Sequence, residues 1–347
     1  MTNTSTPDLR PRIITLGTAG GPRWWKSGSP RTGISTAVVV GENFYLVDCG
    51  HGVGRRLNES GLEMRNLRGI FLTHLHSDHT VDLASLAIFG LYELGDRRGD
   101  PVRIIGPGDR GKLPPVSPRA VVPPRPLAPE CPTPGTAKMF ELLMKAHATD
   151  LNDRIIDSLR PSPLELFEAS DIELPRGLGY DANENPTPEM EPFVIFRDDV
   201  VTVSAILVKH PPVAPAYGLR FDTTEGSVTF SGDTAYTPNM VRLARDTDLL
   251  LHEAIDFGFI EAMYAHKTDE GSRAARDHHY KSHTSVVDAA RVAREAGARQ
   301  LALHHLVPGT APDAVWRQAA DHFDGTFHVP NDLDVIELRP AADRVNV

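Results

Sequence analysis

The residues most able to do chemistry lie in one short stretch, which contains His74, His76, Asp78 and His79. They follow Leu67–Leu72, an apolar run that predicts a buried strand. Side chains two residues apart on an extended chain face the same way, so His74 and His76 can point into one site. Asp78 and His79 come after a turn, where a helix is predicted to begin, and can reach a second point nearby. This spacing predicts two adjacent metal ions rather than a polar loop with scattered histidines.

Four later predicted strands are also followed by histidine or acidic residues. The side chains concerned are His210, Asp233, His252 with Glu253, and His304 with His305. The ends of strands are where α/β folds commonly place binding and catalytic groups. A single histidine at one such point is more often an ordinary buried residue than a ligand. Because five strand ends in one chain carry such groups, they predict one shared site.

Composition bounds the classes of function. The chain has 347 residues, of which 40% are hydrophobic and 24% are charged, which is typical of a globular protein. Its formal net charge of -10 gives no general attraction for nucleic acid, so an RNA substrate would need a local basic patch. The two cysteines, Cys49 and Cys131, form no disulfide framework. No secretory signal and no apolar run of roughly 20 residues is visible, so we expect a cytoplasmic protein without a membrane partner.

The predicted strands first form meanders and then alternate with helices, which indicates an α/β layered sandwich. We expect one domain over residues 1–347. The stretch from about 110 to 190 differs from the rest, because nine prolines between Pro114 and Pro134 exclude regular helix and central strand. Helices are predicted after the prolines, at Thr136–Thr149 and Asp153–Leu159. We interpret this stretch as an insertion that packs as a lid or as an oligomer contact.

A series of short motifs resembles the metallo-β-lactamase superfamily of metallohydrolases. In the order of that family, they include Leu16-Gly17-Thr18, Val47-Asp48-Cys49-Gly50, Thr73 to His79, His210, Ser231-Gly232-Asp233-Thr234, His252-Glu253-Ala254, His283-Thr284-Ser285 and Leu303-His304-His305. Within the superfamily, the sequence is similar to the branch that holds tRNase Z and the metal-dependent arylsulfatases. The resemblance implies the four-layer αβ/βα sandwich of the family, with the proline-rich and helical segment inserted into it.

The resemblance also implies a set of metal ligands. One zinc ion would be held by His74, His76 and His210, the other by Asp78, His79 and His305, and Asp233 would bridge the two. His304 is the rival of His305, since both follow the same strand. Imidazole and carboxylate ligands suit two Zn²⁺ ions, with Mn²⁺ or Fe²⁺ as alternatives. Asp48 resembles a buried carboxylate that supports the histidines of the first cluster.

Hydrolysis by a hydroxide that bridges the two ions is the reaction that the resemblance implies. Asp78 would accept a proton from the water, and His283, paired with Glu253, would protonate the leaving group. Ser77 stands where oxygen-activating di-iron relatives commonly carry an acid, which favours hydrolysis. One departure from tRNase Z is Ile255, where that family usually has threonine.

Three functions are compatible with these residues. The leading prediction is a zinc hydrolase of a small sulfate ester, phosphodiester, lactone or carboxyl ester. Trp24 and Trp25 lie on a glycine-rich loop that is either a packed lid or a platform for the substrate. The alternative is a tRNA 3′-processing endoribonuclease. Against it, the later part of the insertion is rich in Asp and Glu, and Arg119 and Arg125 are the few basic residues of the insertion near the prolines. The third is a non-catalytic metal-binding module. We expect a homodimer with a small-molecule substrate and no nucleic-acid partner.

Overall fold

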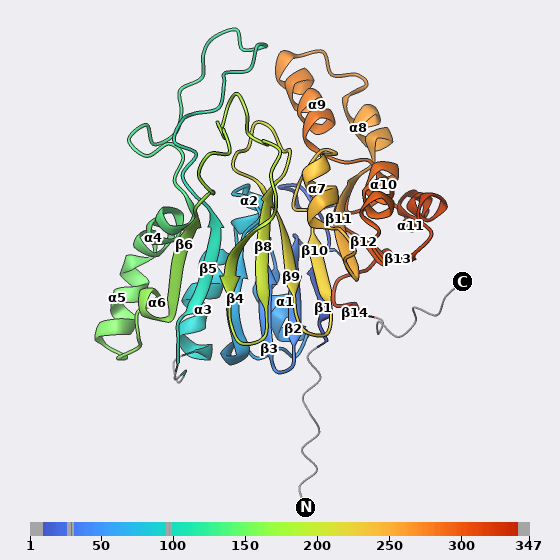
Figure 1. Ribbon diagram of the computed structural model, residues 1–347. Helices are drawn as coiled ribbons and strands as arrows, with labels where there is room; N and C mark the ends of the chain where they lie inside the picture. The colour runs from blue at the N-terminus through green and yellow to red at the C-terminus, as the bar shows by residue number, and fades with distance from the viewer. Residues whose placement is uncertain (1–9, 26–28, 30, 95–96, 98, 339–347) are drawn as a thin grey trace, which may run out of the picture.

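The computed structural model describes residues 10–25, 29, 31–94, 97 and 99–338. Two seven-stranded sheets pack face to face, and helices cover their outer sides (Figure 1). This is the α/β four-layer αβ/βα sandwich that the sequence predicts. Among the described residues, no helix is long and apolar enough to span a membrane.

The first sheet comes from the N-terminal half of the chain and one C-terminal strand. Its order is β14 (Val335–Glu337), β1 (Arg12–Gly17), β2 (Ser35–Val40), β3 (Asn43–Val47), β4 (Leu67–Phe71), β5 (Val102–Pro107) and β6 (Phe167–Ile172). Strands β3 to β6 pair in parallel, so their carboxyl ends meet at one edge of the sheet.

The second sheet comes from the C-terminal half. Its order is β13 (Thr326–His328), β12 (Gln300–Val307), β11 (Leu249–Ile255), β10 (Ser227–Phe230), β9 (Tyr217–Asp222), β8 (Thr202–Leu207) and β7 (Phe193–Arg197). Strands β7 to β10 form an antiparallel meander, whereas β10 to β13 pair in parallel. The carboxyl ends of β10, β11 and β12 therefore lie together.

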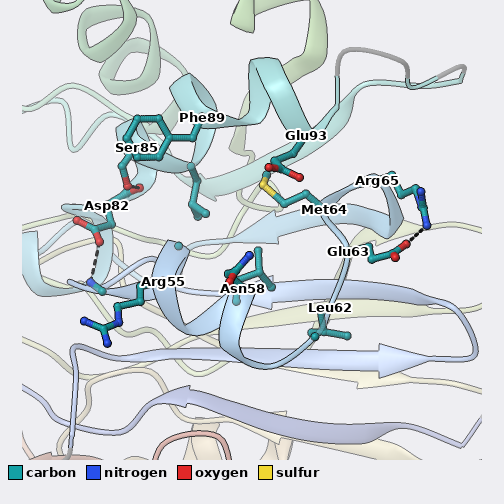
Figure 2. Close-up of a pocket in the computed structure, with 15 residues that line it drawn as sticks. Arg55, Asn58, Leu62, Glu63, Met64, Arg65, Asp82, Ser85, Phe89 and Glu93 are labelled. Carbon is teal, nitrogen blue, oxygen red and sulfur yellow. Dashed lines mark hydrogen bonds and ion pairs between the residues drawn. The ribbon is translucent and has the colours of Figure 1, made fainter.

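The helices divide between the two sheets. Those of the first half are α1 (Val53–Glu59), α2 (Ser77–Thr80), α3 (Leu83–Glu93), α4 (Thr136–Ala146), α5 (Ala148–Ile156) and α6 (Pro163–Leu166). Those of the second half are α7 (Pro238–Leu243), α8 (Phe257–Tyr264), α9 (Glu270–Ser282), α10 (Val286–Ala296) and α11 (Asp313–Trp316), and short 3₁₀ helices span Met64–Asn66 and Arg317–His322. Between α1 and α3 lies a hollow of about 680 Å³, lined partly by Asn58, Met64 and Phe89 (Figure 2). None of the nine predicted site residues lines it.

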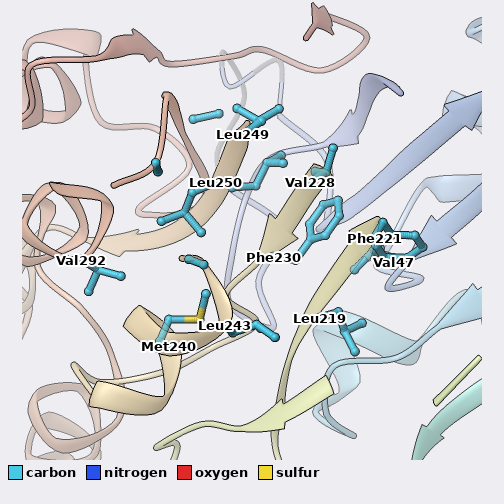
Figure 3. Packing of buried hydrophobic residues seen from close by; sticks show 14 of the residues in the cluster. Val47, Leu219, Phe221, Val228, Phe230, Met240, Leu243, Leu249, Leu250 and Val292 are labelled. Atoms are coloured by element: carbon cyan, nitrogen blue, oxygen red, sulfur yellow. The ribbon is translucent and has the colours of Figure 1, made fainter. Parts of the chain in front are cut away.

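Strand β2 shows how the sequence builds two cores. Successive side chains of a strand point to opposite faces. Val38 and Val40 pack in the cluster between the sheets, whereas Ala37 and Val39 pack in the cluster beneath α1, α3 and α4. Figure 3 shows part of the first cluster, including Val47, Leu219, Phe221, Phe230, Met240 and Val292. Because both faces are buried, the strand contains a continuous apolar run from Ala37 to Val40.

The stretch from about 110 to 190 has two structural parts up to Ile172, followed by residues 173–192, which contain no helix and no strand of either sheet. Residues 108–135, the proline-rich arm, contain no helix or strand and extend beyond the sheets in Figure 1. Helices α4 to α6 then lead to β6, which pairs with β5 through Val102 and Phe167. This second part extends the first sheet and covers it, so the segment that stands outside the sandwich is shorter than the sequence indicated. Its role as a lid or oligomer contact stays a prediction.

Two strands are longer than the sequence indicated. Strand β11 continues to Ile255 and β12 continues to Val307, because apolar side chains follow the histidines and resume the strand pattern. His252, Glu253, His304 and His305 therefore lie within strands instead of just past their ends. Residues 256–281, for which no element was predicted, contain α8 and α9, which pack against each other.

Asp332 ties the C-terminal segment to the loop that follows β1. Its carboxylate accepts hydrogen bonds from N and Oγ1 of Thr18, at 3.0 and 2.8 Å, and from N and Oγ1 of Thr32, at 2.7 and 2.8 Å. Arg31 adds a bond to Thr18 Oγ1 and another to the carbonyl oxygen of Pro330. The start of the loop that carries Trp25 is thereby held in place.

Candidate metal centre

Seven of the predicted side chains meet where the carboxyl ends of the parallel strands of both sheets come together. In the described part of the chain they form two groups whose ligand atoms lie within 4.8 Å of one another: His74, His76, His210 and Asp233, and Asp78, His79, Asp233 and His305. Asp233 belongs to both groups, so it lies between the two positions. His305 belongs to the second group, and its rival His304 belongs to neither.

The first group brings three imidazole rings together. Nδ1 of His76 lies 3.1 Å from Nε2 of His74 and 3.2 Å from Nε2 of His210. Burial lowers the pKa of His74 and of His210 well below the usual value, so these rings are neutral near pH 7. His210 donates from Nδ1 to the carbonyl oxygen of Ser282 at 2.8 Å, which leaves Nε2 as a lone-pair donor. Neutral imidazoles with facing lone pairs suit a cation.

The second group contains polar atoms that need a partner. Nε2 of His305 lies 3.3 Å from Oδ2 of Asp78 and 3.4 Å from Oδ1 of Asp233, and Nε2 of His79 lies 3.4 Å from the same Oδ1. Within the described residues, His79 Nε2 and Asp233 Oδ1 are buried without a hydrogen-bond partner. Such atoms are costly to leave unsatisfied. A metal ion between them would satisfy both, so the residues present fit the two metal ions that the sequence implies.

Residues around the groups hold the ligands in position. Nδ1 of His79 donates to Oδ2 of Asp48 at 2.8 Å, and Oδ1 of Asp48 accepts from the backbone N–H of Thr73 at 2.8 Å. This is the support that the sequence predicts for Asp48. The ring of His305 lies so close to Gly20 that a Cβ there would stand 2.4 Å from the ring. Position 20 therefore requires glycine.

His283 and Glu253 form a buried pair beside the two groups. Nδ1 of His283 lies 3.0 and 3.1 Å from the two carboxylate oxygens of Glu253. The backbone N–H of Thr234 donates to Glu253 Oε1 at 2.6 Å, which fixes the carboxylate. Burial disfavours a charge on His283, but the Glu253 carboxylate raises the pKa of the imidazole to about 9. A ring that carries a proton near pH 7 thus lies 3.9 Å from Oδ2 of Asp233.

A cavity of about 250 Å³ opens beside the second group. Its polar wall includes Asp78, Asp233, His283 and His305, and its apolar wall includes Trp25, Ile255, Phe259, Ile260, Met263 and Val307. Of the two tryptophans on the glycine-rich loop, Trp25 lines the cavity. Trp24 does not, since 86% of its surface is exposed and its ring lies beside His51.

Sequence reasoning missed His278 and His279, which line the same cavity from α9. Burial lowers the pKa of each to about 4, so both rings are neutral near pH 7. The adjacent histidines were a visible signal. Residues 256–281 show no apolar periodicity that predicts a helix, so the sequence does not indicate which of their side chains face the cavity.

A second cavity, of about 310 Å³, lies on the side of the proline-rich arm. Its wall includes His76, Arg110, Pro114, Pro134 and Pro212. His76 borders both cavities, so the metal-binding groups can be approached from two sides.

Comparison with known proteins agrees with this geometry. The family "Anti-Pycsar protein Apyc1" matches residues 35–104, and the family "Beta-lactamase superfamily domain" matches residues 153–306. A Ribonuclease Z of Mycobacterium sp. (strain KMS) is 30% identical over 325 residues, which cover 90% of this chain and 94% of the relative.

Solved structures show the same fold at lower identity. The short form of human tRNase Z is 19% identical with a TM-score of 0.58, and the match covers 94% of this chain and 99% of that chain. The metallo-β-lactamase fold protein YhfI from Bacillus subtilis is 17% identical, with the same TM-score and the same two coverages.

The chain belongs to the metallo-β-lactamase superfamily. It is a metal-dependent hydrolase of that superfamily, and two groups of histidine and aspartate side chains can each hold a metal ion.

Proposed function

We propose that this chain is a phosphodiesterase that acts on RNA and releases the 3′ trailer of a precursor tRNA. The observation that carries the proposal is 30% identity over 90% of the chain to a Ribonuclease Z. The small ester-like substrate expected from the sequence has no comparable support, so the alternative considered there becomes the main proposal.

The charge of the proline-rich arm supports an RNA substrate over a small ester. The arm, residues 108–135, contains four basic residues (Arg110, Lys112, Arg119 and Arg125) and two acidic ones (Asp109 and Glu130), which gives it a charge of 4 − 2 = +2. The acidic residues that argued against RNA lie later, between 150 and 191. Part of that stretch flanks the first sheet, and one of its residues, Asp181, pairs with Lys112 of the arm. Local positive charge beside the site can attract phosphates even though the whole chain carries -10.

We assign the metal ligands as the sequence predicted them. His74, His76 and His210 would hold one Zn²⁺ ion, Asp78, His79 and His305 the other, and Asp233 would bridge them. Such a pair of ions supplies an activated water and positive charge for the phosphate. Mn²⁺ or Fe²⁺ could replace zinc, since imidazole and carboxylate bind all three.

The remaining steps belong to residues of the chain. Asp78 is a carboxylate of the second group that lines the cavity, and it would accept a proton from the attacking water. The water oxygen forms a new bond to phosphorus, and the ester bond between phosphorus and the leaving oxygen breaks. His283 gives its proton to that oxygen, and Glu253 stabilises the charged imidazole before the transfer.

A cleavage assay tests the proposal. Protein loaded with zinc is incubated at physiological salt with a precursor tRNA, a bis-aryl phosphodiester and an aryl sulfate. We expect release of an intact 3′ trailer at one position, and no turnover of the sulfate. Turnover of the aryl sulfate without RNA cleavage would contradict the proposal and restore the small-ester prediction.

A small phosphodiester is the second candidate. The cavity of about 250 Å³ favours it, because this volume lies just below the range of about 300–1,000 Å³ that is typical for drug-sized ligands and so suits a small molecule. In the same assay, efficient cleavage of the bis-aryl phosphodiester with an untouched precursor tRNA would identify this candidate. The homodimer also stays a prediction, which the mass of the protein in solution tests.

A further inference from the structure

The apolar wall of the cavity is separate from the cores that hold the sheets together. Ile255, Ile260 and Val307 form a small buried cluster, with Trp25 and Phe259 packed against it. This cluster is distinct from the two clusters on the faces of the sheets. The aromatic and aliphatic side chains of this wall lie beside metal-binding residues and outside both cores. They can therefore bind a ligand rather than stabilise the fold.

Two contacts fix Trp25 in this wall. Its Nε1 donates to the carbonyl oxygen of Gly20 at 3.1 Å. Its ring lies against Gly309, where a Cβ would stand 2.7 Å from a ring atom. The ring centroid of Phe259 lies 6.2 Å from that of Trp25, and the two planes are inclined at 66°. The rings of Trp25 and Phe259 are thus already in position to contact a ligand.

The size of the cavity limits what it can hold. A protein cavity of about 150 Å³ accommodates one benzene molecule. At about 250 Å³, this cavity has room for one planar ring system with part of an attached sugar, and not for a longer stretch of nucleic acid.

The position of the cavity indicates which part of the substrate enters it. His283, the proposed proton donor, lies in its wall together with Phe259 and Met263. A proton donor must contact the departing oxygen. The group attached to that oxygen therefore extends along the wall that contains His283.

We propose that this cavity binds the part of the departing strand that is attached to the leaving oxygen, and that this part is a single nucleoside with a planar ring. The ring would lie against Trp25 and Phe259. His278 and His279, with ring centroids 5.8 and 6.1 Å from that of His283, would contact its polar edge or its sugar. The inference deepens the proposed function and depends on phosphodiester cleavage, because it names the group that departs.

Two substrates and two variants test the inference. The substrates are a dinucleoside monophosphate and the corresponding methyl ester, in which methanol replaces the departing nucleoside. The variants are Phe259→Ala and, as a matched control from the same helix, Phe257→Ala. Phe257 packs against the same small cluster as Phe259 and stacks on Tyr280, with centroids 4.5 Å apart, but it does not line the cavity. Metal content and thermal unfolding of each variant are measured first.

We expect Phe259→Ala to lower kcat/KM for the dinucleoside by about 5- to 100-fold, the range of base-stacking contributions, and to leave the methyl ester unchanged. Phe257→Ala should affect neither substrate. Binding of the free nucleoside product, followed by NMR, should weaken in Phe259→Ala alone. If Phe259→Ala does not fold, Met263→Ala on the same wall takes its place.

Three results would overturn the inference. Equal losses on both substrates would show a structural role for Phe259. Equal effects of the two variants would show that lining the cavity makes no difference, and so that the cavity does not bind the leaving group. If the wild-type protein cleaves precursor tRNA but neither small phosphodiester, the inference alone is overturned. If it does not cleave precursor tRNA either, the proposed function fails as well.

Discussion

Arg119 of the proline-rich arm is joined to Asp277 of α9, 158 residues further along the chain. Its Nε and Nη2 lie 3.0 and 2.9 Å from Oδ2 of Asp277, and its Nη1 lies 3.1 Å from Oε2 of Glu270. These bonds connect the arm with the helix that carries His278 and His279, as the closeness of the two segments in Figure 1 indicates. Ion pairs at the surface contribute only about 0–1 kcal/mol each, so RNA phosphates can compete for Arg119.

Removing the acidic partner should free Arg119 for RNA. Asp277→Asn is expected to lower KM for precursor tRNA a few-fold. One more phosphate contact should also make the slope of the logarithm of the binding constant against the logarithm of the salt concentration more negative by about 0.7 to 0.9. Kinetics at several salt concentrations measure both effects. Glu261→Gln is the control, because Glu261 pairs with Arg276 rather than with the arm. An equal gain in the control would indicate a general charge effect.

Asp233→Ala should remove more than one equivalent of metal, because Asp233 belongs to both groups. Activity should fall by more than about 100-fold, since even residues that only support a ligand contribute 10- to 100-fold. Elemental analysis of the purified variant measures the metal. His51→Ala, at an exposed position outside both groups, should keep the wild-type content. Two equivalents of metal retained by Asp233→Ala would refute the bridging role.

His283→Ala should retain both metals and lose activity, because His283 lies outside the two groups. The loss should reach about 10²- to 10⁴-fold for substrates with poor leaving groups, the usual range for general acid catalysis. Phosphodiesters whose leaving groups differ in pKa provide the measurement. For a good leaving group the loss should be small. A loss independent of the leaving group would exclude proton donation.

The pH dependence should report the pair of His283 and Glu253. Burial acts against the charged ring, but Glu253 raises the pKa of His283 from 6.5 to about 9. The imidazole is therefore protonated below about pH 9 and loses its proton as the pH rises through that value, so kcat should fall there. In Glu253→Gln the neutral amide no longer raises the pKa, and the fall should begin at lower pH. Profiles of kcat against pH for the wild-type protein and for Glu253→Gln measure the shift. If the two profiles coincide, Glu253 does not raise the pKa of His283.

Much of the fold and of the metal-binding geometry could be predicted because the signals are local. His74, His76, Asp78 and His79 lie on one strand exit, and a short stretch of backbone sets their geometry. The choice between His304 and His305 could not be made locally, since both follow the same apolar run. A shift in register between β11 and β12 and the close approach of Gly20 place His305 in the site.

The walls of the site were harder to predict. The surface of α9 is mostly polar, so its sequence shows little apolar periodicity, and its position depends on contacts with α8 and with Arg119. Strand β6 could not be predicted for a different reason. It follows a proline-rich segment that indicates an insertion, and only its pairing with β5 identifies it as part of the first sheet.

Asp332 has a practical consequence for handling the protein. Through its four hydrogen bonds, the C-terminal segment holds the loop that carries Gly20 and Trp25 in position. Asp332→Ala would loosen that loop while β14 stays paired with β1. The variant would then bind substrate poorly while keeping its secondary structure. A circular dichroism spectrum alone would not reveal the damage.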